Sequence, residues 1–354
     1  MHHFKLGQNT QNVLYWFFAG ASLGFSFLHA SLWLLGFVGI ILLLRAVYHS
    51  QNFKQVLFGS VFMGWLYFGL VLAWYWSVYP INGFVISPTL SILAIFISWF
   101  LCALFLGFGK LLVVLPLYFY KDTQYKKYVL WALPLLWVLS DMLGAFLFTI
   151  QSYGAGSTLN TKFSFGWLGY LLADHVVLGT LATWGGVFIL TFVYVYVALL
   201  FDRVLQADLN IKWFILLGMF LTLILTGVLF ASEKVHDESL KVAALDTSLP
   251  SVRGVSEKDL PAYQTELMQH VTKAITDGAA YVILPEGARM TGVFTSPEEA
   301  LGYIANIAPA DVVVVDSGWY HATEERSYVR AFIYDTRTMS IYKLDKKYLV
   351  PQGE

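Results

Sequence analysis

The feature that most limits how this chain can fold is a series of long apolar stretches separated by short links. A helix needs about 20 mostly apolar residues to cross a membrane. We read seven such stretches, at about 12–29, 31–48, 55–78, 89–112, 129–150, 180–201 and 212–231. The link between the first two is so short that we expect a tight helical hairpin there. Residues 1–231 are therefore predicted to form a multi-pass α-helical membrane domain of about seven spans.

The composition separates this region from the rest of the chain. Only 13% of the residues are charged and 58% are hydrophobic, against roughly 25% charged in an ordinary soluble domain. The apolar excess lies before Ala231 and most acidic residues follow it, so residues 232–354 are predicted to be a second, water-exposed domain. The net charge of −1 argues against a nucleic-acid partner. Nothing in the sequence indicates a cofactor or a metal.

The basic residues predict an orientation, because loops on the cytoplasmic side of a membrane protein carry an excess of Lys and Arg. If the N-terminus is cytoplasmic, the outside links before residue 232 hold only Lys162. The inside segments then hold Lys5, Arg45, Lys54, Lys121, Lys126, Lys127, Arg203 and Lys212. Seven crossings place residues 232–354 outside the cytoplasm. Lys110, inside the fourth stretch, is expected to extend its side chain to the cytoplasmic interface.

The segment 151–179 is apolar but interrupted by glycines, and it is expected to lie along the outer interface. Such a loop can meet a lipid substrate or simply connect two helices. Asp174 and His175 are neighbours in it, and we interpret them as polar loop residues because adjacent side chains do not face each other by default.

The pattern changes after Lys241, where short apolar runs alternate with helical ones. Helices are expected at about 261–277 and from Ser296, each with a proline in its first turn. Strands are expected at 241–247, 280–284, 311–317, 328–335 and 339–344. This alternation predicts a layered α/β domain.

Glu286 directly follows the apolar strand VILP, so it should lie at the carboxyl end of that strand, where open α/β sheets usually build their sites. Lys346 comes after the last predicted strand, and Glu354 is the final residue. We expect Glu286 and Lys346 on neighbouring strand ends. Such a set suits attack by a cysteine thiol, with one carboxylate as general base, the ammonium stabilising the oxyanion, and the second carboxylate orienting these groups.

The run YKLDKKYLVPQGE (342–354) is similar to the Tyr-Asp-Lys-x-x-Leu-Val-Pro-Phe-Gly-Glu run of the apolipoprotein N-acyltransferases. The segments ALPLLWVLSD (132–141) and WGGVFILTFV (184–193) also resemble this family. By position, the resemblance implies that Glu286 is the catalytic base, Lys346 the catalytic lysine and Glu354 the second essential carboxylate. It also implies that the second domain is an αββα nitrilase-like sandwich, of which this chain holds an incomplete part.

The resemblance further implies a reaction. An acyl chain passes from a membrane phospholipid to an enzyme cysteine, and then to the α-amino group of the N-terminal cysteine of a diacylglyceryl apolipoprotein. The implied partners are that phospholipid, that apolipoprotein and the lipid bilayer, and the implied location is the bacterial cytoplasmic (inner) membrane.

The chain departs from the family pattern in several places. Gln352 stands for Phe, Val329 for the usual Asn, and the family's Glu-x-x-Arg appears as Asp141 and Gly144. No cysteine follows Lys346, so we expect this chain alone to be inactive.

The only cysteine, Cys102, lies in the fourth apolar stretch and is predicted to be a buried structural thiol near or below mid-bilayer. A non-catalytic membrane scaffold or binding relative is therefore the alternative. A transporter is disfavoured, because its spans should carry charged groups that face a path, and apart from Lys110 and Asp141 the predicted spans do not.

Overall fold

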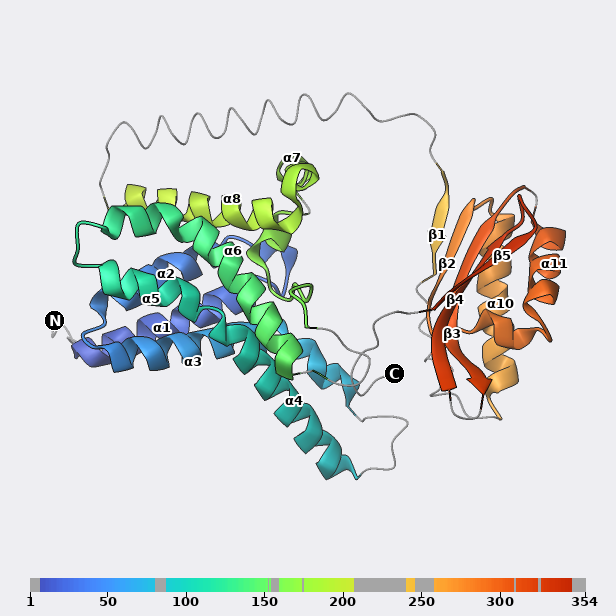
Figure 1. Ribbon diagram of the computed structural model, residues 1–354, viewed down its shortest axis with the longest axis horizontal. Coiled ribbons are helices and arrows are strands. Elements are labelled where there is room, and N and C mark those ends of the chain that lie inside the picture. The colour runs from blue at the N-terminus through green and yellow to red at the C-terminus, as the bar shows by residue number, and fades with distance from the viewer. Residues whose placement is uncertain are drawn as a thin grey trace, which may run out of the picture. The chain divides into compact units, whose positions relative to one another are not determined.

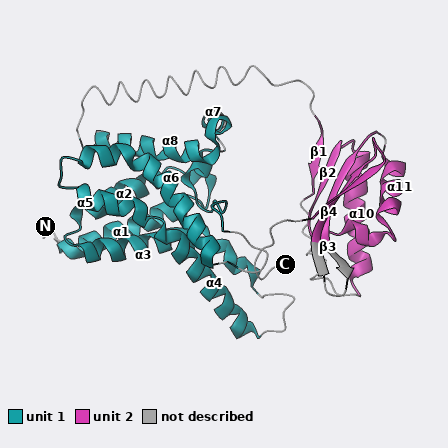
Figure 2. Cartoon of the chain, viewed as in Figure 1, with its two compact units in different colours: residues 1–81, 86–153, 158–235 teal, residues 82–85, 154–157, 236–354 magenta. Residues whose placement is uncertain are grey.

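The computed structural model describes residues 7–79, 87–151, 153, 159–173, 175–206, 240–245, 258–308, 310–323 and 326–345. The chain falls into two compact units (Figure 2). The first holds 1–81, 86–153 and 158–235, and the second 82–85, 154–157 and 236–354. Each unit has its own hydrophobic core.

The first unit is a bundle of helices (Figure 1). Its described helices are α1 (Gln8–Phe25), α2 (Leu35–His49), α3 (Phe53–Val71), α4 (Pro88–Phe108), α5 (Leu111–Tyr120), α6 (Lys126–Gln151), α7 (Val176–Gly179) and α8 (Ala182–Leu205). Five stretches are long and apolar enough to cross a membrane: Ala30–His49, Phe53–Val71, Pro88–Phe108, Lys126–Gln151 and Ala182–Arg203. The unit is therefore a membrane-type helical domain, while the count of seven spans stays a prediction.

The helix ends differ from the predicted stretches in physically clear ways. The third stretch ends as a 3-10 helix at Ala73–Val78 rather than as a continuous α-helix. The overlong fourth stretch breaks between Phe108 and Leu111, which separates α4 from α5. The first two helices do pack against each other as a hairpin. The seventh stretch, 212–231, lies outside the described residues.

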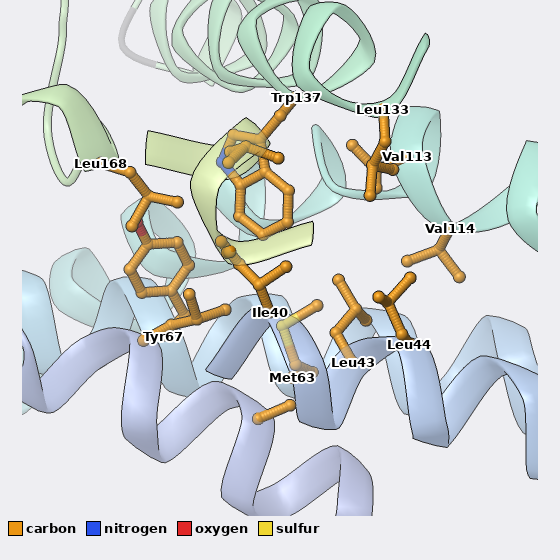
Figure 3. Packing of buried hydrophobic residues seen from close by; sticks show 14 of the residues in the cluster. Ile40, Leu43, Leu44, Met63, Tyr67, Val113, Val114, Leu133, Trp137 and Leu168 are labelled. Carbon is orange, nitrogen blue, oxygen red and sulfur yellow. The ribbon is translucent and has the colours of Figure 1, made fainter. Parts of the chain in front are cut away.

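Glycines set the closest helix contacts in the bundle. A Cβ on Gly107 would lie 2.6 Å from the carbonyl carbon of Gly64, so α3 and α4 touch through their backbones. A Cβ on Gly144 would lie 2.5 Å from the carbonyl oxygen of Leu106, which fixes α6 against the end of α4. Such close approach needs residues without side chains and is typical of helices packed within membranes. Figure 3 shows the apolar side chains that fill the core between these helices, including Ile40, Met63, Tyr67, Val113 and Trp137.

The described residues of the segment 151–179 pack on the bundle. Trp167, Leu168 and Leu172 are buried, the Gly169 amide donates to Thr191 Oγ1 at 3.0 Å, and Gly166 takes a positive φ of 66°. His175 meets the ring of Trp33 edge-on, with 4.8 Å between ring centroids, while Asp174 lies outside the described residues. The described part of this segment therefore contributes to the core and holds the short helices Leu168–Leu172 and Val176–Gly179.

The second unit is a five-stranded sheet with helices on one side (Figure 1). Its elements are β1 (Val242–Ala244), α10 (Leu260–Thr276), β2 (Tyr281–Glu286), α11 (Pro297–Ile307), β3 (Val313–Thr323), β4 (Arg326–Asp335) and β5 (Ser340–Asp345). The strand order is β1-β2-β3-β4-β5, with the first three parallel and the last two antiparallel to their neighbours. Every predicted strand and helix of this region is present.

The predicted helix signals are visible in detail. Ser296 caps α11 by accepting a hydrogen bond at 3.1 Å from the Glu299 amide, and Pro297 occupies the first turn. Pro261 occupies the first turn of α10, and Gly278 follows its end with φ of 83°. Because these signals act within a few residues, sequence reasoning found them directly.

Only one face of the sheet is covered by helices among the described residues. Val282, Leu284 and Val314 lie on the covered face within the core. The register places Val242, Ile283, Tyr342 and Leu344 on the other face, where each is more than 40% exposed. This arrangement is compatible with one half of a sandwich, and the nitrilase-like fold stays a prediction.

Candidate functional site

Glu286 ends β2 and is exposed. The pairing of β2 with β3 runs Ile283 to Val315 and then Glu286 to Ser317, so β2 holds one extra residue. A slip of one residue moves a side chain to the opposite face of a sheet. Strict alternation from Val282 and Leu284 would place Glu286 on the helix-covered face. The bulge instead places it on the uncovered face, in register with Ser317.

The turn after Glu286 is firmly held. Gly287 has φ of 84°, which favours glycine, and its amide donates to the Ser317 carbonyl at 3.0 Å. Arg289 takes a left-handed φ of 52°, a strained conformation for a side-chain-bearing residue. The Tyr263 hydroxyl donates to the Ala288 carbonyl at 3.2 Å. Glu286 therefore precedes a turn that hydrogen bonds connect to β3 and α10.

Asp316 anchors the far end of this turn, and sequence reasoning did not single it out. Its Oδ2 accepts hydrogen bonds from the Thr291 amide at 3.0 Å and the Thr291 hydroxyl at 2.6 Å. Burial raises the pKa of the Asp316 carboxyl above its usual value of 3.8, while the Thr291 hydrogen bonds oppose that rise. The signal available in the sequence was an aspartate directly after the run of four valines at 312–315.

Lys346 and Glu354 lie outside the described residues, so their positions stay predictions. Lys346 directly follows Asp345, the last residue of β5. Because β5 runs parallel to β2, its carboxyl end lies at the same edge of the sheet as Glu286. The expectation of neighbouring strand ends is wrong, however, since β3 and β4 lie between β2 and β5. Three strand spacings therefore place β2 and β5 roughly 14 Å apart.

At this edge, Arg330, which follows Val329, forms an ion pair with its cross-strand partner Asp345. Arg330 on β4 donates through Nε to Oδ1 of Asp345 at 2.5 Å and through a terminal nitrogen to Oδ2 at 2.9 Å. This pair holds the pKa of the Asp345 carboxyl below its usual value. It connects Asp345, the last residue of β5, to β4.

A cavity of about 300 Å³ lies beside the same turn. Its lining includes Arg289, Thr291, Glu298, Phe332 and Lys343. Glu286 is not among the lining residues that the structure describes, which agrees with its place on the uncovered face of the sheet. The cavity is therefore separate from the position of the proposed base.

The helical unit contains a second candidate, an ion pair between Lys110 and Asp141. Both side chains are fully buried, and Lys110 Nζ also donates to Ser140 Oγ at 3.2 Å. It lies 4.6 Å from the centre of the Trp137 ring. The prediction that Lys110 extends to the interface is therefore wrong. Because a charge inside a bundle is costly to bury alone, it turns inward to a carboxylate on another helix.

The ion pair connects the break between α4 and α5 to α6. Lys110 lies in the break between α4 and α5, and Asp141 is in the middle of α6. The glycine contacts described above bring the break against α6, so the ion pair and the close backbone approach act at one point. The signal available in the sequence was the presence of two opposite charges within apolar stretches, but their 31-residue separation gave no partner assignment.

Cys102 is buried in α4, as predicted. The Tyr75 hydroxyl and Cys102 Sγ lie 3.3 Å apart, and Sγ approaches Gln151 Oε1 at 3.6 Å. Tyr75 lies in the 3-10 helix that follows α3, and Gln151 is the last residue of α6, so the thiol lies beside the C-terminal ends of both helices. These contacts make it a packed structural group. No three His, Cys, Asp or Glu side chains gather as a metal site in the described ranges.

The helical unit matches a protein-family model, the apolipoprotein N-acyltransferase N-terminal domain, over residues 19–200. This match covers more than half of the chain. The chain belongs to the apolipoprotein N-acyltransferase family. A comparison with curated protein sequences gives no match.

Family membership gives the ion pair a context. The fifth predicted stretch has Asp141 and Gly144 where the resemblance described above expects Glu-x-x-Arg. The structure supplies a cation to Asp141 from Lys110 of another helix, and the missing side chain at Gly144 gives the α4–α5 break room to approach α6. Asp141 and Gly144, the two departures from the pattern, thus both contribute to the contact between α6 and the α4–α5 break.

Proposed function

We propose that this protein acts in N-acylation of lipoproteins, with a membrane phospholipid as acyl donor and a diacylglyceryl apolipoprotein as acceptor. The family match supports this assignment, and the family implies lipid and lipoprotein substrates. The observation that supports the site is the bulge in β2, which places the exposed Glu286 before a hydrogen-bonded turn at the carboxyl edge of the sheet. We propose an orientation in which the sheet lies outside the cytoplasm of a bacterial inner membrane, as the basic residues indicate.

The proposed chemistry has two balanced steps. In the first, a cysteine thiol attacks the ester carbonyl of the phospholipid, a C–S bond forms, and the C–O bond breaks. Glu286 accepts the thiol proton and returns it to the leaving lysophospholipid oxygen. In the second, the lipoprotein α-amine attacks the thioester, a C–N bond forms, the C–S bond breaks, and the amine proton passes through Glu286 to the sulfur.

Lys346 is proposed to stabilise the oxyanion of each tetrahedral intermediate, and Glu354 to orient the lysine and the base. The proposed nucleophile is not Cys102, because that thiol is packed among helices of the apolar unit. It is the only cysteine of the sequence. We therefore expect the 354 residues by themselves to show no turnover.

The first experiment is to read the gene beyond the codon for Glu354 and to express the product of the whole reading frame. Its activity is measured by mass spectrometry as acyl transfer from phospholipid vesicles to a diacylated lipopeptide. The Glu286→Gln variant should lose about 10²–10⁴-fold in rate, the contribution typical of general acid–base catalysis. Glu266→Gln, which changes an exposed carboxylate on α10, is the matched control and should keep full activity.

Two results would count against this proposal. Full activity of the Glu286→Gln variant would remove Glu286 from the mechanism. A gene product that binds the lipopeptide without transferring an acyl chain would support the alternative, a non-catalytic membrane scaffold or binding protein, which the burial of Cys102 favours.

A further inference from the structure

A cavity of about 220 Å³ lies between the start of α6 and the end of α8. It is lined by Lys127, Leu130, Trp131, Tyr196, Leu199, Leu200, Asp202 and Arg203. Both helices belong to the stretches that are long and apolar enough to cross a membrane. The cavity is therefore located where two apolar spans meet their basic ends.

The charged part of the lining is suited to an anion. Lys127 is exposed and Arg203 is partly exposed. Asp202 is the single acidic residue of the lining, and both of its oxygens already accept hydrogen bonds. Arg45 donates to Oδ1 at 2.8 Å and Gln206 to Oδ2 at 2.5 Å. Because Arg45 balances the carboxylate, the two lining cations give this cavity a positive character.

A further cation lies close to the same helix end. The Nζ of Lys126 is 4.3 Å from the centre of the Tyr48 ring, and Tyr48 is on α2, one turn after Arg45. This places Lys126 and Arg45 at the same end of the bundle as Lys127 and Arg203. The positive charge is therefore contributed by three helices rather than by one exposed face.

The remaining lining is apolar and aromatic. Leu130, Leu199 and Leu200 lie one turn further into their helices than Lys127 and Arg203. The rings of Trp131 and Tyr196 lie 6.3 Å apart on the two helices, and aromatic residues of this type are enriched at membrane interfaces. Along the helix axes the lining thus changes from the cations Lys127 and Arg203 at the helix ends to leucines and aromatic rings that lie one to two turns further in. A phospholipid has the same division, with its charged phosphate at one end and its apolar acyl chains beyond it.

We propose that this cavity binds an anionic phospholipid of the adjoining leaflet. Lys127 and Arg203 contact the phosphate, and Trp131, Tyr196 and the leucines contact the glycerol and the first part of an acyl chain. Pockets that enclose a whole drug-sized ligand start at roughly 300 Å³, so a cavity of about 220 Å³ holds only this part of the lipid. The rest of the acyl chains stays in the bilayer.

An anionic lipid is favoured over a zwitterionic one for an electrostatic reason. The choline ammonium of phosphatidylcholine offsets the charge of its phosphate, whereas phosphatidylglycerol keeps a net negative charge. Basic pockets between membrane helices are a recurrent form of anionic-lipid recognition. The inference is independent of the proposed acyl transfer, because no residue of this cavity is assigned a catalytic role.

The test uses the full 354-residue chain, delipidated in detergent and then mixed with phosphatidylglycerol or phosphatidylcholine. Native mass spectrometry counts the lipids that each protein retains. We expect more retained phosphatidylglycerol than phosphatidylcholine. The Arg203→Gln variant should lower phosphatidylglycerol affinity about fivefold, the effect of about one basic residue near an anionic lipid. Arg203→Lys should recover most of it.

Lys54→Gln is the matched control, since Lys54 is an exposed cation on α3 that does not line this cavity. Circular dichroism confirms that each variant keeps its helices. Equal retention of both lipids would overturn the proposal. Equal losses in the Lys54→Gln and Arg203→Gln variants would also overturn it, because the attraction would then be a diffuse property of basic loops. Displacement of the lipid by an acidic peptide would assign the cavity to a protein partner instead.

Discussion

The helical unit and the α/β unit each bury an aspartate, but they stabilise it differently. Asp141 in α6 is paired with the ammonium of Lys110, whereas Asp316 in β3 accepts hydrogen bonds from the neutral amide and hydroxyl of Thr291. In the apolar bundle a neighbouring cation is needed to offset the loss of hydration. In β3, the central strand of the sheet, Thr291 supplies neutral hydrogen-bond donors to Asp316 instead.

The two units also use glycine differently. In the bundle, Gly107 and Gly144 lie where a methyl group would meet backbone of another helix. In α11, Gly302 has nothing within 4 Å of the position where its Cβ would be. Glycine therefore determines packing distance in the first unit and contributes only backbone freedom at this position in the second.

The largest expected effect comes from breaking the buried ion pair. Lys110→Met leaves the Asp141 carboxylate without its cation inside the bundle, and should lower the free energy of unfolding by about 3–5 kcal/mol. The loss is measured by thermal unfolding of the full chain in detergent. The double variant Lys110→Met with Asp141→Leu should recover most of this stability, because no charge is then buried. Equal stability of the single variant and the wild type would show that the pair contributes nothing.

Gly144→Ala should have the next largest effect. The added methyl group would lie 2.5 Å from the Leu106 carbonyl oxygen, so α6 must move away from the end of α4. Overpacking of this kind costs about 1–3 kcal/mol. The same thermal measurement checks it, and hydrogen exchange should increase around the α4–α5 break. An unchanged melting temperature would mean that the helix contact adjusts without cost.

Asp316→Ala should destabilise the α/β unit by about 1–3 kcal/mol, because it removes the acceptor of two hydrogen bonds from the partly buried Thr291. Hydrogen exchange of the sheet amides in the full chain measures the loss and assigns it to this unit. Amides of the helical unit serve as the internal control and should not change.

The pH dependence of the same site has a definite sign. Burial raises the pKa of Asp316 above 3.8, so the folded unit binds this proton more tightly than the unfolded chain does. The contribution of Asp316 to stability is therefore largest at low pH and decreases as pH rises through the folded pKa. Asp316→Asn keeps an acceptor oxygen and should remove this slope. An identical slope in the variant would assign the pH dependence to other groups.

The smallest expected effect is a gain. Gly302→Ala should stabilise α11 by about 0.5–1 kcal/mol, because alanine loses less backbone freedom on folding and has open space at this position. Hydrogen exchange of the α11 amides is the measurement. A loss of stability would show that the two units do not differ in their use of glycine as described.

Much of the α/β unit followed from the sequence because its signals are local. The Ser296 cap, the prolines in the first turns and the short β-branched strands each act over a few residues. The bulge before Glu286 did not follow, since it depends on the register between β2 and β3. Sequence spacing alone therefore identified the candidate base but not the face on which it lies.

The apolar stretches, taken alone, predicted the five long apolar helices that the structure describes between Ala30 and Arg203, because hydrophobic length needs no tertiary contact to be recognised. They also identified Cys102 as a buried thiol. Only the tertiary structure decided the partner of Lys110, the break at Gly109 and the strand order that separates Glu286 from the end of β5. These features depend on contacts between residues that are far apart in sequence and that form only when helices and strands pack. Local secondary-structure propensity carries no information about such contacts.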